Sequence, residues 1–128
     1  MIDQRILDFI GEHHVLTVAS VAFGDGGPAT SAAEPWCANA FYVFDTQEEA
    51  FIITSEAKTR HAQLFLENPK VAGTVVLETE EIGKIRGLQF TGTVRRCDGG
   101  LFDRCRLLYL KRFPYAVFNG GGAWRIPP

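Results

Sequence analysis

The chain has 128 residues, of which 46% are hydrophobic and 22% charged, so it has the length and apolar content of one packed domain, residues 1–128. Thirteen basic and fifteen acidic residues give a formal net charge of −2, which disfavours binding to nucleic acid or to an anionic membrane. No apolar run approaches the roughly 20 residues that cross a bilayer, and the N-terminus lacks a cationic signal-peptide start, so we expect a cytoplasmic protein.

The cysteines and histidines predict neither a disulfide framework nor a metal site. Three cysteines, Cys37, Cys97 and Cys105, are an odd number without a CxxC pair, and His13, His14 and His61 are scattered. Free cysteine is among the residues most often buried, so reduced core thiols are the default expectation. A reactive thiol beside a redox cofactor remains the alternative.

The first third of the chain predicts a helix, a strand and a turn. Apolar residues recur at helical spacing in residues 3–12, and Asp3 is placed to cap that helix. Residues 14–23 are rich in valine and alternate apolar with small side chains, which indicates a strand. Gly24-Asp25-Gly26-Gly27-Pro28 then has the composition of a turn.

The middle of the chain predicts a hairpin followed by a short helix. In 36–45, WCANAFYVFD, successive residues alternate between two faces, both of which carry bulky side chains, so a strand covered on both sides fits best. A second strand over 50–54 is close enough in the sequence to pair with it. Ser55 stands at an N-cap position, the apolar stripe of 57–66 predicts a helix, and Asn68-Pro69 ends it.

The last part predicts two antiparallel strands, a helix and a short β tail. Residues 71–77 and 87–96 read as strands, 99–113 has helical spacing, and 115–126 holds one or two strands around Gly120-Gly121-Gly122. Strands with inserted helices and no βαβ rhythm argue for an α+β domain, mainly β, whose antiparallel sheet can close into a barrel.

One cluster of polar residues predicts a phosphate site. Thr54 and Ser55 end a strand, and Lys58, Thr59, Arg60 and His61 open the next helix. A helix N-terminus offers unpaired N–H groups and a partial positive charge, to which the two cations would add charge-assisted hydrogen bonds. The simpler interpretation is that Ser55 only caps the helix and that both cations are solvated. No Walker or GxGxxG motif is present, so ATP and dinucleotides are not favoured.

Two further polar positions are ambiguous. Gly87, Gln89, Thr91 and Thr93 share one face of a strand, where Gln89 could bond a ring edge and Gly87 would allow a planar ligand to approach the backbone. A solvated outer face is the equal alternative. Asn39 lies among bulky residues and therefore needs a partner, either a ligand amide or the neighbouring backbone.

The order of four segments resembles the pyridoxamine 5′-phosphate oxidase-like, FMN-binding split-barrel family, closest to its YhbP-like branch. These segments are LTVAS, PWCANAFYVFD, FIITSEAKTRHAQLFLENPKVAGTV and IRGLQFTGTVRR, and they span roughly residues 15–96. The resemblance implies a six-stranded antiparallel Greek-key split barrel with short flanking helices. It also implies a homodimer with FMN in each of two grooves at the subunit interface.

The resemblance also assigns residues to the flavin. The phosphate would be held by the set already noted, Thr54, Ser55, Lys58, Thr59, Arg60 and His61. The ring would lie along two strands, against Cys37, Ala38, Asn39 and Ala40 and against Arg86, Gly87 and Gln89. The sequence departs from the family in a Gly-rich insertion at 24–27 and in ending at Pro128, before segments expected in this branch. It lacks the Arg-rich features that bind pyridoxamine phosphate, so vitamin B6 oxidation is not carried over.

The expected function is an FMN-dependent oxidoreductase acting on an unidentified small molecule. No general acid or base is visible in the sequence. The alternative is a non-catalytic module that binds or senses FMN, haem or another planar ligand. A third possibility is a barrel that has lost its ligand and acts as a dimeric interaction protein.

Overall fold

A computed structural model describes residues 2–23, 33–116 and 121–128. The turn expected at 24–28 and Gly120 lie outside these residues. The elements follow in the order α1 (Gln4–Glu12), β1 (Val15–Phe23), β2 (Ala33–Asp45), β3 (Ala50–Ser55), α2 (Arg60–Glu67), β4 (Lys70–Leu77), a 3₁₀ turn (Ile82–Lys84), β5 (Arg86–Thr93), β6 (Arg95–Arg96), α3 (Gly99–Arg112) and β7 (Gly122–Ile126). No described helix is both long and apolar enough to span a bilayer.

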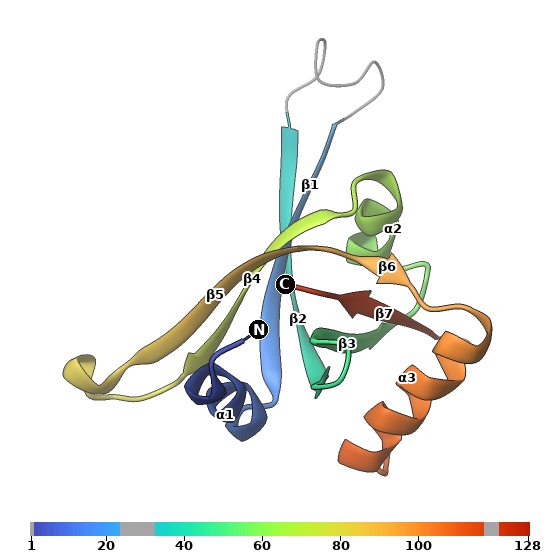
Figure 1. Cartoon of the computed structure of the whole chain (residues 1–128). Helices are drawn as coiled ribbons and strands as arrows, with labels where there is room; N and C mark the ends of the chain where they lie inside the picture. The colour runs from blue at the N-terminus through green and yellow to red at the C-terminus, as the bar shows by residue number, and fades with distance from the viewer. Residues whose placement is uncertain (1, 24–32, 117–120) are drawn as a thin grey trace.

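The strands form one curled antiparallel sheet in the order β5-β4-β1-β2-β3-β7-β6 (Figure 1). β5 and β6 lie at opposite ends of this order, yet Val94 alone separates them in the sequence. One continuous segment therefore runs from one edge of the sheet to the other, which curls the sheet into a split barrel. This confirms the predicted fold class.

The strand count is seven where six were expected, and the difference arises at Val94. The single strand predicted over 87–96 divides there: residues up to Thr93 pair with β4, while Arg95 and Arg96 pair with β7. The Val94 N–H donates to the carbonyl of Pro69 at 2.8 Å instead of to a strand of the sheet. The split thus reflects a change of pairing partner along a nearly continuous strand.

The barrel core is formed by side chains on the inward face of the sheet. Tyr42, Phe51, Ile53 and Trp124 are almost completely buried and share one cluster, in which the Tyr42 and Phe51 rings meet edge to face. The Tyr42 hydroxyl donates to the Ile10 carbonyl of α1 at 2.6 Å, and burial raises the pKa of Tyr42 to about 12. The phenol therefore stays protonated and joins α1 to the barrel.

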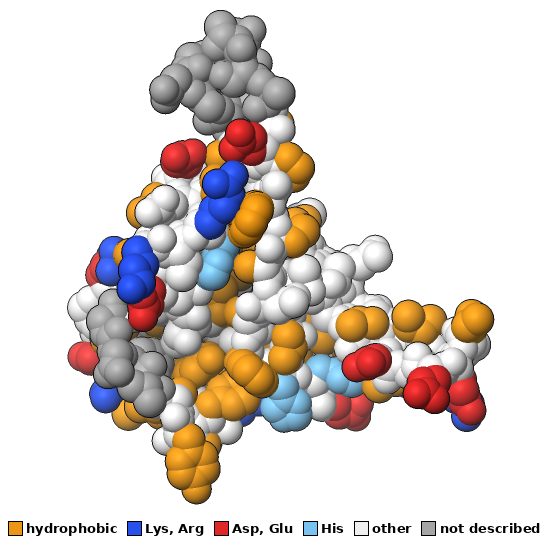
Figure 2. All heavy atoms as spheres, turned by 180° about the vertical axis from the view of Figure 1, so that it is seen from behind, with side chains coloured by type: hydrophobic (Ala, Val, Ile, Leu, Met, Phe, Trp, Pro, Cys, Tyr) orange, Lys and Arg blue, Asp and Glu red, His pale blue; other side chains and the backbone are white. Residues whose placement is uncertain are grey.

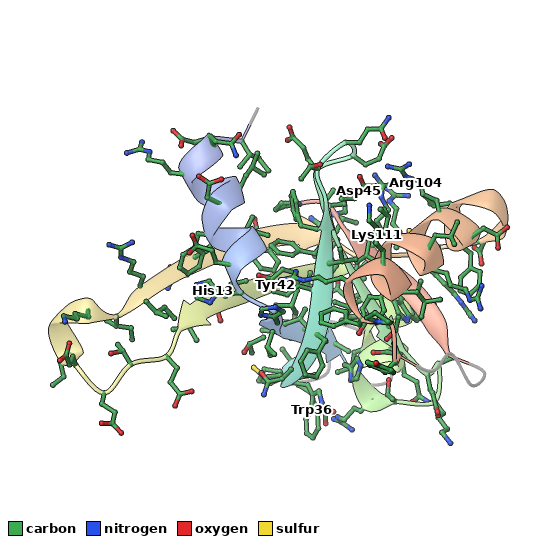
Figure 3. All side chains as sticks on the ribbon, turned by 90° about the horizontal axis from the view of Figure 1, so that it is seen from below. His13, Trp36, Tyr42, Asp45, Arg104 and Lys111 are labelled. Atoms are coloured by element: carbon green, nitrogen blue, oxygen red, sulfur yellow. The ribbon has the colours of Figure 1, made fainter. Side chains whose placement is uncertain are left out.

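α3 covers the other side of β3 and β7 and makes a second, smaller cluster. Its buried members are Ile52, Cys97, Cys105, Tyr109 and Ala123. At the edge of this cluster the buried Asp45 carboxylate accepts hydrogen bonds from the Arg104 guanidinium, at 3.0 to 3.2 Å, and from the backbone N–H groups of Gln47 and Glu48 (Figure 3). The β2–β3 turn is thereby tied to α3.

The structure corrects the predicted start of the second helix. Ser55 is the last residue of β3 and does not cap α2. Residues 56–58 make a turn, in which the Thr59 N–H donates to the Glu56 carbonyl at 3.1 Å. Thr59 is the N-cap, and its hydroxyl accepts from the Ala62 N–H at 3.3 Å. Apolar periodicity could not separate this turn from the helix, because turn residues can continue the same pattern.

Candidate functional site

The end of β3 and the first turn of α2 bring three polar side chains together. The Oγ of Ser55 lies 2.6 Å from Nε2 of His61, and the Oγ1 of Thr59 lies 3.4 Å from the same nitrogen. Trp124 holds this strand end in place, because its Nε1–H donates to the Ser55 carbonyl at 3.3 Å. Three of the six predicted phosphate residues therefore meet at the helix N-terminus.

Burial lowers the pKa of His61 below its usual value of 6.5. The imidazole is half-buried, and the Phe65 ring lies 5.7 Å away, edge-on to it. Near neutral pH the ring is therefore uncharged and can donate a hydrogen bond through one nitrogen and accept through the other.

The two predicted cations flank this cluster and are ion-paired. Arg60 lies 3.1 Å from the Glu34 carboxylate, and its guanidinium stacks over the exposed Trp36 ring at 4.7 Å. Lys58 lies 3.1 Å from Glu56 and is largely exposed. Figure 2 shows basic, hydrophobic and histidine side chains close together below the grey segment at the top of the molecule. Both cations are on the surface and can turn to an added anion.

Thr54 does not join the other predicted phosphate residues. Successive residues of a strand point to opposite faces, so Thr54 lies on the face of β3 opposite Ser55. Its neighbour on β7 is Ala123, a member of the cluster below α3.

The predicted ring residues of β2 divide between two faces. Ala38 and Ala40 pack against the barrel core, while Cys37 and Asn39 are exposed on the outer face. On that outer face a polar row crosses four strands in register, formed by Asn39 (β2), Thr17 (β1), Thr74 (β4) and Gln89 (β5). Asn39 has a protein partner, because the Thr17 hydroxyl donates to its Oδ1 at 2.7 Å.

The next row on the outer face contains small residues and forms a shallow depression. Cys37, Ala19, Ala72 and Thr91 follow one another across the same four strands. Together with Thr17, Thr74 and Gln89 they line a depression of about 590 Å³. β1 and β4 were not predicted to be part of the site, although the alternation in both strands could have indicated it.

The predicted residues of β5 lie far from those of β2 within one chain. β1 and β4 stand between the two strands, and three strand spacings amount to about 14 Å. Gly87 and Gln89 share the outer face with Asn39, but Arg86 points to the opposite face by alternation. Only some of the residues predicted to contact the flavin ring therefore lie on the same face of the sheet.

Part of one edge of β2, near the predicted phosphate residues, is not paired with another described strand. β2 pairs with β3 only from Tyr42 to Asp45, so within the described structure residues 33–41 have no strand partner on that side. Arg60, the first residue of α2, contacts Glu34 and Trp36 of this edge, so the edge adjoins the α2 N-terminus. Among the described residues, no group of three or more His, Cys, Asp or Glu side chains is placed to bind a metal.

Comparison with known families agrees with this architecture. The family model described as Pyridoxamine 5′-phosphate oxidase matches residues 2–115. The UPF0306 protein YhbP of Escherichia coli O7:K1 is 48% identical over 93 residues, covering 73% of this chain and 63% of the relative. A UPF0306 protein of Citrobacter koseri is 46% identical over 93 residues, covering 73% and 64%. This chain spans just under two thirds of the length of these two relatives.

Solved structures share the fold at low sequence identity. HutZ, the heme storage protein from Vibrio cholerae, superposes with a TM-score of 0.77 at 18% identity, covering 98% of this chain and 89% of HutZ. A heme binding protein from Mycobacterium smegmatis gives a TM-score of 0.70 at 15% identity, covering 92% and 47%. Rv2991 from Mycobacterium tuberculosis gives 0.75 at 19% identity, covering 98% and 79%.

Proposed function

This chain belongs to the pyridoxamine 5′-phosphate oxidase family, in its YhbP-like branch, and on that premise we propose that it binds FMN as a homodimer and serves as a flavin-dependent oxidoreductase. The observation that carries the proposal is the convergence of Ser55, Thr59 and His61 at the α2 N-terminus, with Arg60 and Lys58 beside them. Such a set suits the terminal phosphate of FMN.

The phosphate half fits because donors face an anion there. The Ser55–His61 bond uses one of its two possible donors and leaves the other available, and the first turn of α2 carries free backbone N–H groups. The Thr59 hydroxyl donates to the Glu56 carbonyl at 2.8 Å and would turn to a phosphate only by giving up that bond. Arg60 and Lys58 would exchange their present carboxylate partners for the phosphate. Arg60 also has the fork geometry that matches phosphate oxygens.

The ring half is supported by the open edge of β2 next to this phosphate site. Residues 37–40 would present backbone donors and acceptors to the edge of a planar ring. Gln89, about 14 Å away in the same chain, would reach that ring from a second copy. The site is then complete only in a dimer.

The outer face of the sheet supports dimerisation. Phe41, Val15 and Val76 lie on this face of β2, β1 and β4, and these residues are 57%, 42% and 51% exposed. The polar row with Thr17 lies between them and the row of small residues. The exposed apolar side chains at one end of the face would pack against a second copy of the chain.

Bound FMN would supply electron or hydride transfer, and this chain's residues would bind and orient it. Ser55, Thr59, Arg60 and His61 would hold the phosphate and so set the position of the ring. The outer face, covered by a second copy, would exclude water from one side of the groove. The substrate is a small molecule whose chemistry the described residues do not specify.

Titration of the purified protein with FMN, followed by flavin fluorescence, tests the proposal. Replacing both Lys58 and Arg60 with Ala should weaken FMN affinity by about 10- to 100-fold, since charge-assisted hydrogen bonds contribute about 1.5–3 kcal/mol. The matched control replaces Arg5 and Lys84, two other exposed cations, and should leave affinity unchanged. Equal affinity of the two double variants would refute the phosphate site.

A second candidate ligand is haem, because two proteins of the same fold are a heme storage protein and a heme binding protein. The absorption spectrum of the purified protein separates the candidates. Flavin bands that co-elute with a dimer favour FMN, and a reductant-dependent turnover of that flavin favours the oxidoreductase over a storage module. A Soret band on adding haemin, with no response to FMN, would favour the haem alternative.

A further inference from the structure

Two buried thiols lie side by side beneath α3, away from the proposed flavin site. The Sγ atoms of Cys97 and Cys105 are 3.3 Å apart, and the residues are 3% and 1% exposed. Cys97 follows β6, and Cys105 lies in α3. Closing a disulfide would require the sulfurs to approach to about 2.05 Å, a movement that side-chain rotation and a small backbone shift can supply.

An unpaired guanidinium nitrogen lies close to these thiols. The Nε of Arg125 is buried and has no hydrogen-bond partner among the described residues, while an Nη of the same side chain lies 3.5 Å from Glu48. A buried donor without an acceptor is costly, so its position calls for an explanation. A thiolate in the cysteine pair would give this guanidinium a second negative partner beside Glu48.

The surroundings of the pair shift the pKa values of the two thiols in opposite directions. The hydrogen bond from Cys97 lowers the pKa of the Cys105 thiol; burial opposes this effect, and the positive charge of Arg125 reinforces it. Arg104 also lowers that pKa, whereas the Asp45 carboxylate raises it. The same hydrogen bond raises the pKa of Cys97, because it holds the second proton. The two sulfurs therefore share one proton after the first ionisation.

One of the two cysteines borders a surface depression. Cys97 lines a depression of about 470 Å³ together with Arg96, Asp98, Asp103 and Gly122. Cys105 does not line it, and both residues are buried. Cys97 is therefore the cysteine nearer to a small molecule in the depression, and a local opening of the segment around Cys97 would expose its sulfur for a stepwise exchange of disulfides.

We propose that Cys97 and Cys105 form a redox-active dithiol that is oxidised to an intramolecular disulfide by a low-molecular-weight disulfide. The Cys105 thiolate accepts the proton of Cys97 as Sγ of Cys97 attacks one sulfur of the small disulfide, which breaks its S–S bond and releases one thiolate. Cys105 then gives this proton to the released thiolate and attacks Sγ of Cys97, and the second small thiolate leaves and takes a proton from the solvent. Two S–H groups become one S–S bond, and one small disulfide is reduced to two thiols.

Mass spectrometry of the full chain with Cys37→Ser, which removes the exposed cysteine, tests the proposal. The reduced protein is incubated with oxidised glutathione, quenched with acid, unfolded and treated with N-ethylmaleimide. We expect a species two hydrogens lighter that takes up no maleimide, with peptides containing Cys97 and Cys105 cross-linked. Uptake of two maleimides after incubation, or a disulfide between two chains, would overturn the proposal.

Two sets of variants separate a redox pair from ordinary core thiols. With Cys105→Ser we expect a stable glutathione adduct on Cys97, because the resolving thiol is missing; with Cys97→Ser we expect little adduct, because Cys105 does not line the depression. Arg125→Met should slow exchange at pH 7 by up to about tenfold for each unit that the thiol pKa rises. Arg95→Met, at the exposed neighbour of Arg125 on β6, is the matched control. Equal rates in the two methionine variants would refute the role of Arg125.

Discussion

The imidazole Nε2 of His61 lies 2.6 Å from the hydroxyl oxygen of Ser55, across the turn that joins β3 to α2. The Ser55 carbonyl accepts from Trp124 of β7 in the same place. A strand end, a helix N-terminus and the last strand are therefore joined at one residue. The proposed phosphate site lies where the barrel itself holds the backbone in position.

Protonation of His61 should destabilise the fold in mildly acidic solution. Burial lowers the pKa of the folded group below 6.5, so the unfolded chain takes up the proton first as the pH falls. The contribution to stability is fully present above pH 6.5 and is lost as the pH drops from there towards the folded pKa. Urea unfolding between pH 5 and 8 should show this loss, and His61→Gln should remove it. The exposed His14→Gln is the control, and the same slope in both variants would contradict the prediction.

Neutralising Glu34 should strengthen anion binding at the α2 N-terminus. The Glu34 carboxylate holds Arg60 at 3.1 Å and would compete with a phosphate for it. Because the pair is exposed and contributes at most about 1 kcal/mol, Glu34→Gln should raise FMN affinity by about two- to fivefold. Fluorescence titration measures this change. Glu81→Gln disrupts a similar exposed pair with Lys84 and should have no effect; weaker FMN binding by Glu34→Gln would argue that Glu34 helps to bind the ligand.

A charge on the outer face of β4 should disrupt the proposed homodimer. Val76 is 51% exposed in the row that also contains Phe41 and Val15. Val76→Glu would bury a carboxylate at the interface between copies, which is strongly unfavourable without a partner. We expect sedimentation velocity to show a shift to monomer and a parallel loss of FMN affinity. Ile82→Glu, at a 93% exposed position outside the sheet, is the matched control and should leave the dimer intact. A dimer that persists with Val76→Glu would exclude this face as the dimer interface.

A methyl group at Gly73 should destabilise the barrel. A Cβ there would lie 2.3 Å from Cζ of Phe90 and 2.8 Å from the Thr17 carbonyl oxygen, so the Phe90 ring would have to leave its place in the core. Gly73→Ala should therefore cost about 1–3 kcal/mol of unfolding free energy. Gly11→Ala in α1 meets no atom within 4 Å and should instead add up to about 1 kcal/mol through helix propensity. Urea denaturation distinguishes the two, and a neutral Gly73→Ala would show that Phe90 repacks freely.

The local elements and their faces could be predicted from the sequence. Period-two alternation placed Ala38, Ala40 and Tyr42 on one face of β2 and Cys37 and Asn39 on the other, as the structure has them. The prediction that both faces are covered was wrong, because the face of Cys37 and Asn39 is exposed. The Asp3 cap and the hairpin of β2 with β3 also agree with prediction. These features depend on backbone geometry over a few residues, and for that reason a short stretch of sequence specifies them.

The sequence by itself thus determined where most strands and helices form, which residues of a strand share a face, and the family. The tertiary structure alone decided that β5 stands three strands from β2, that the chain changes strand partner at Val94, and that Cys97 and Cys105 meet beside Arg125. Pairing of distant strands and packing of α3 on the sheet depend on how the whole chain buries its apolar surface and satisfies its backbone hydrogen bonds. The local periodicity of the sequence does not specify which strands pair, because each strand could equally pair with several others.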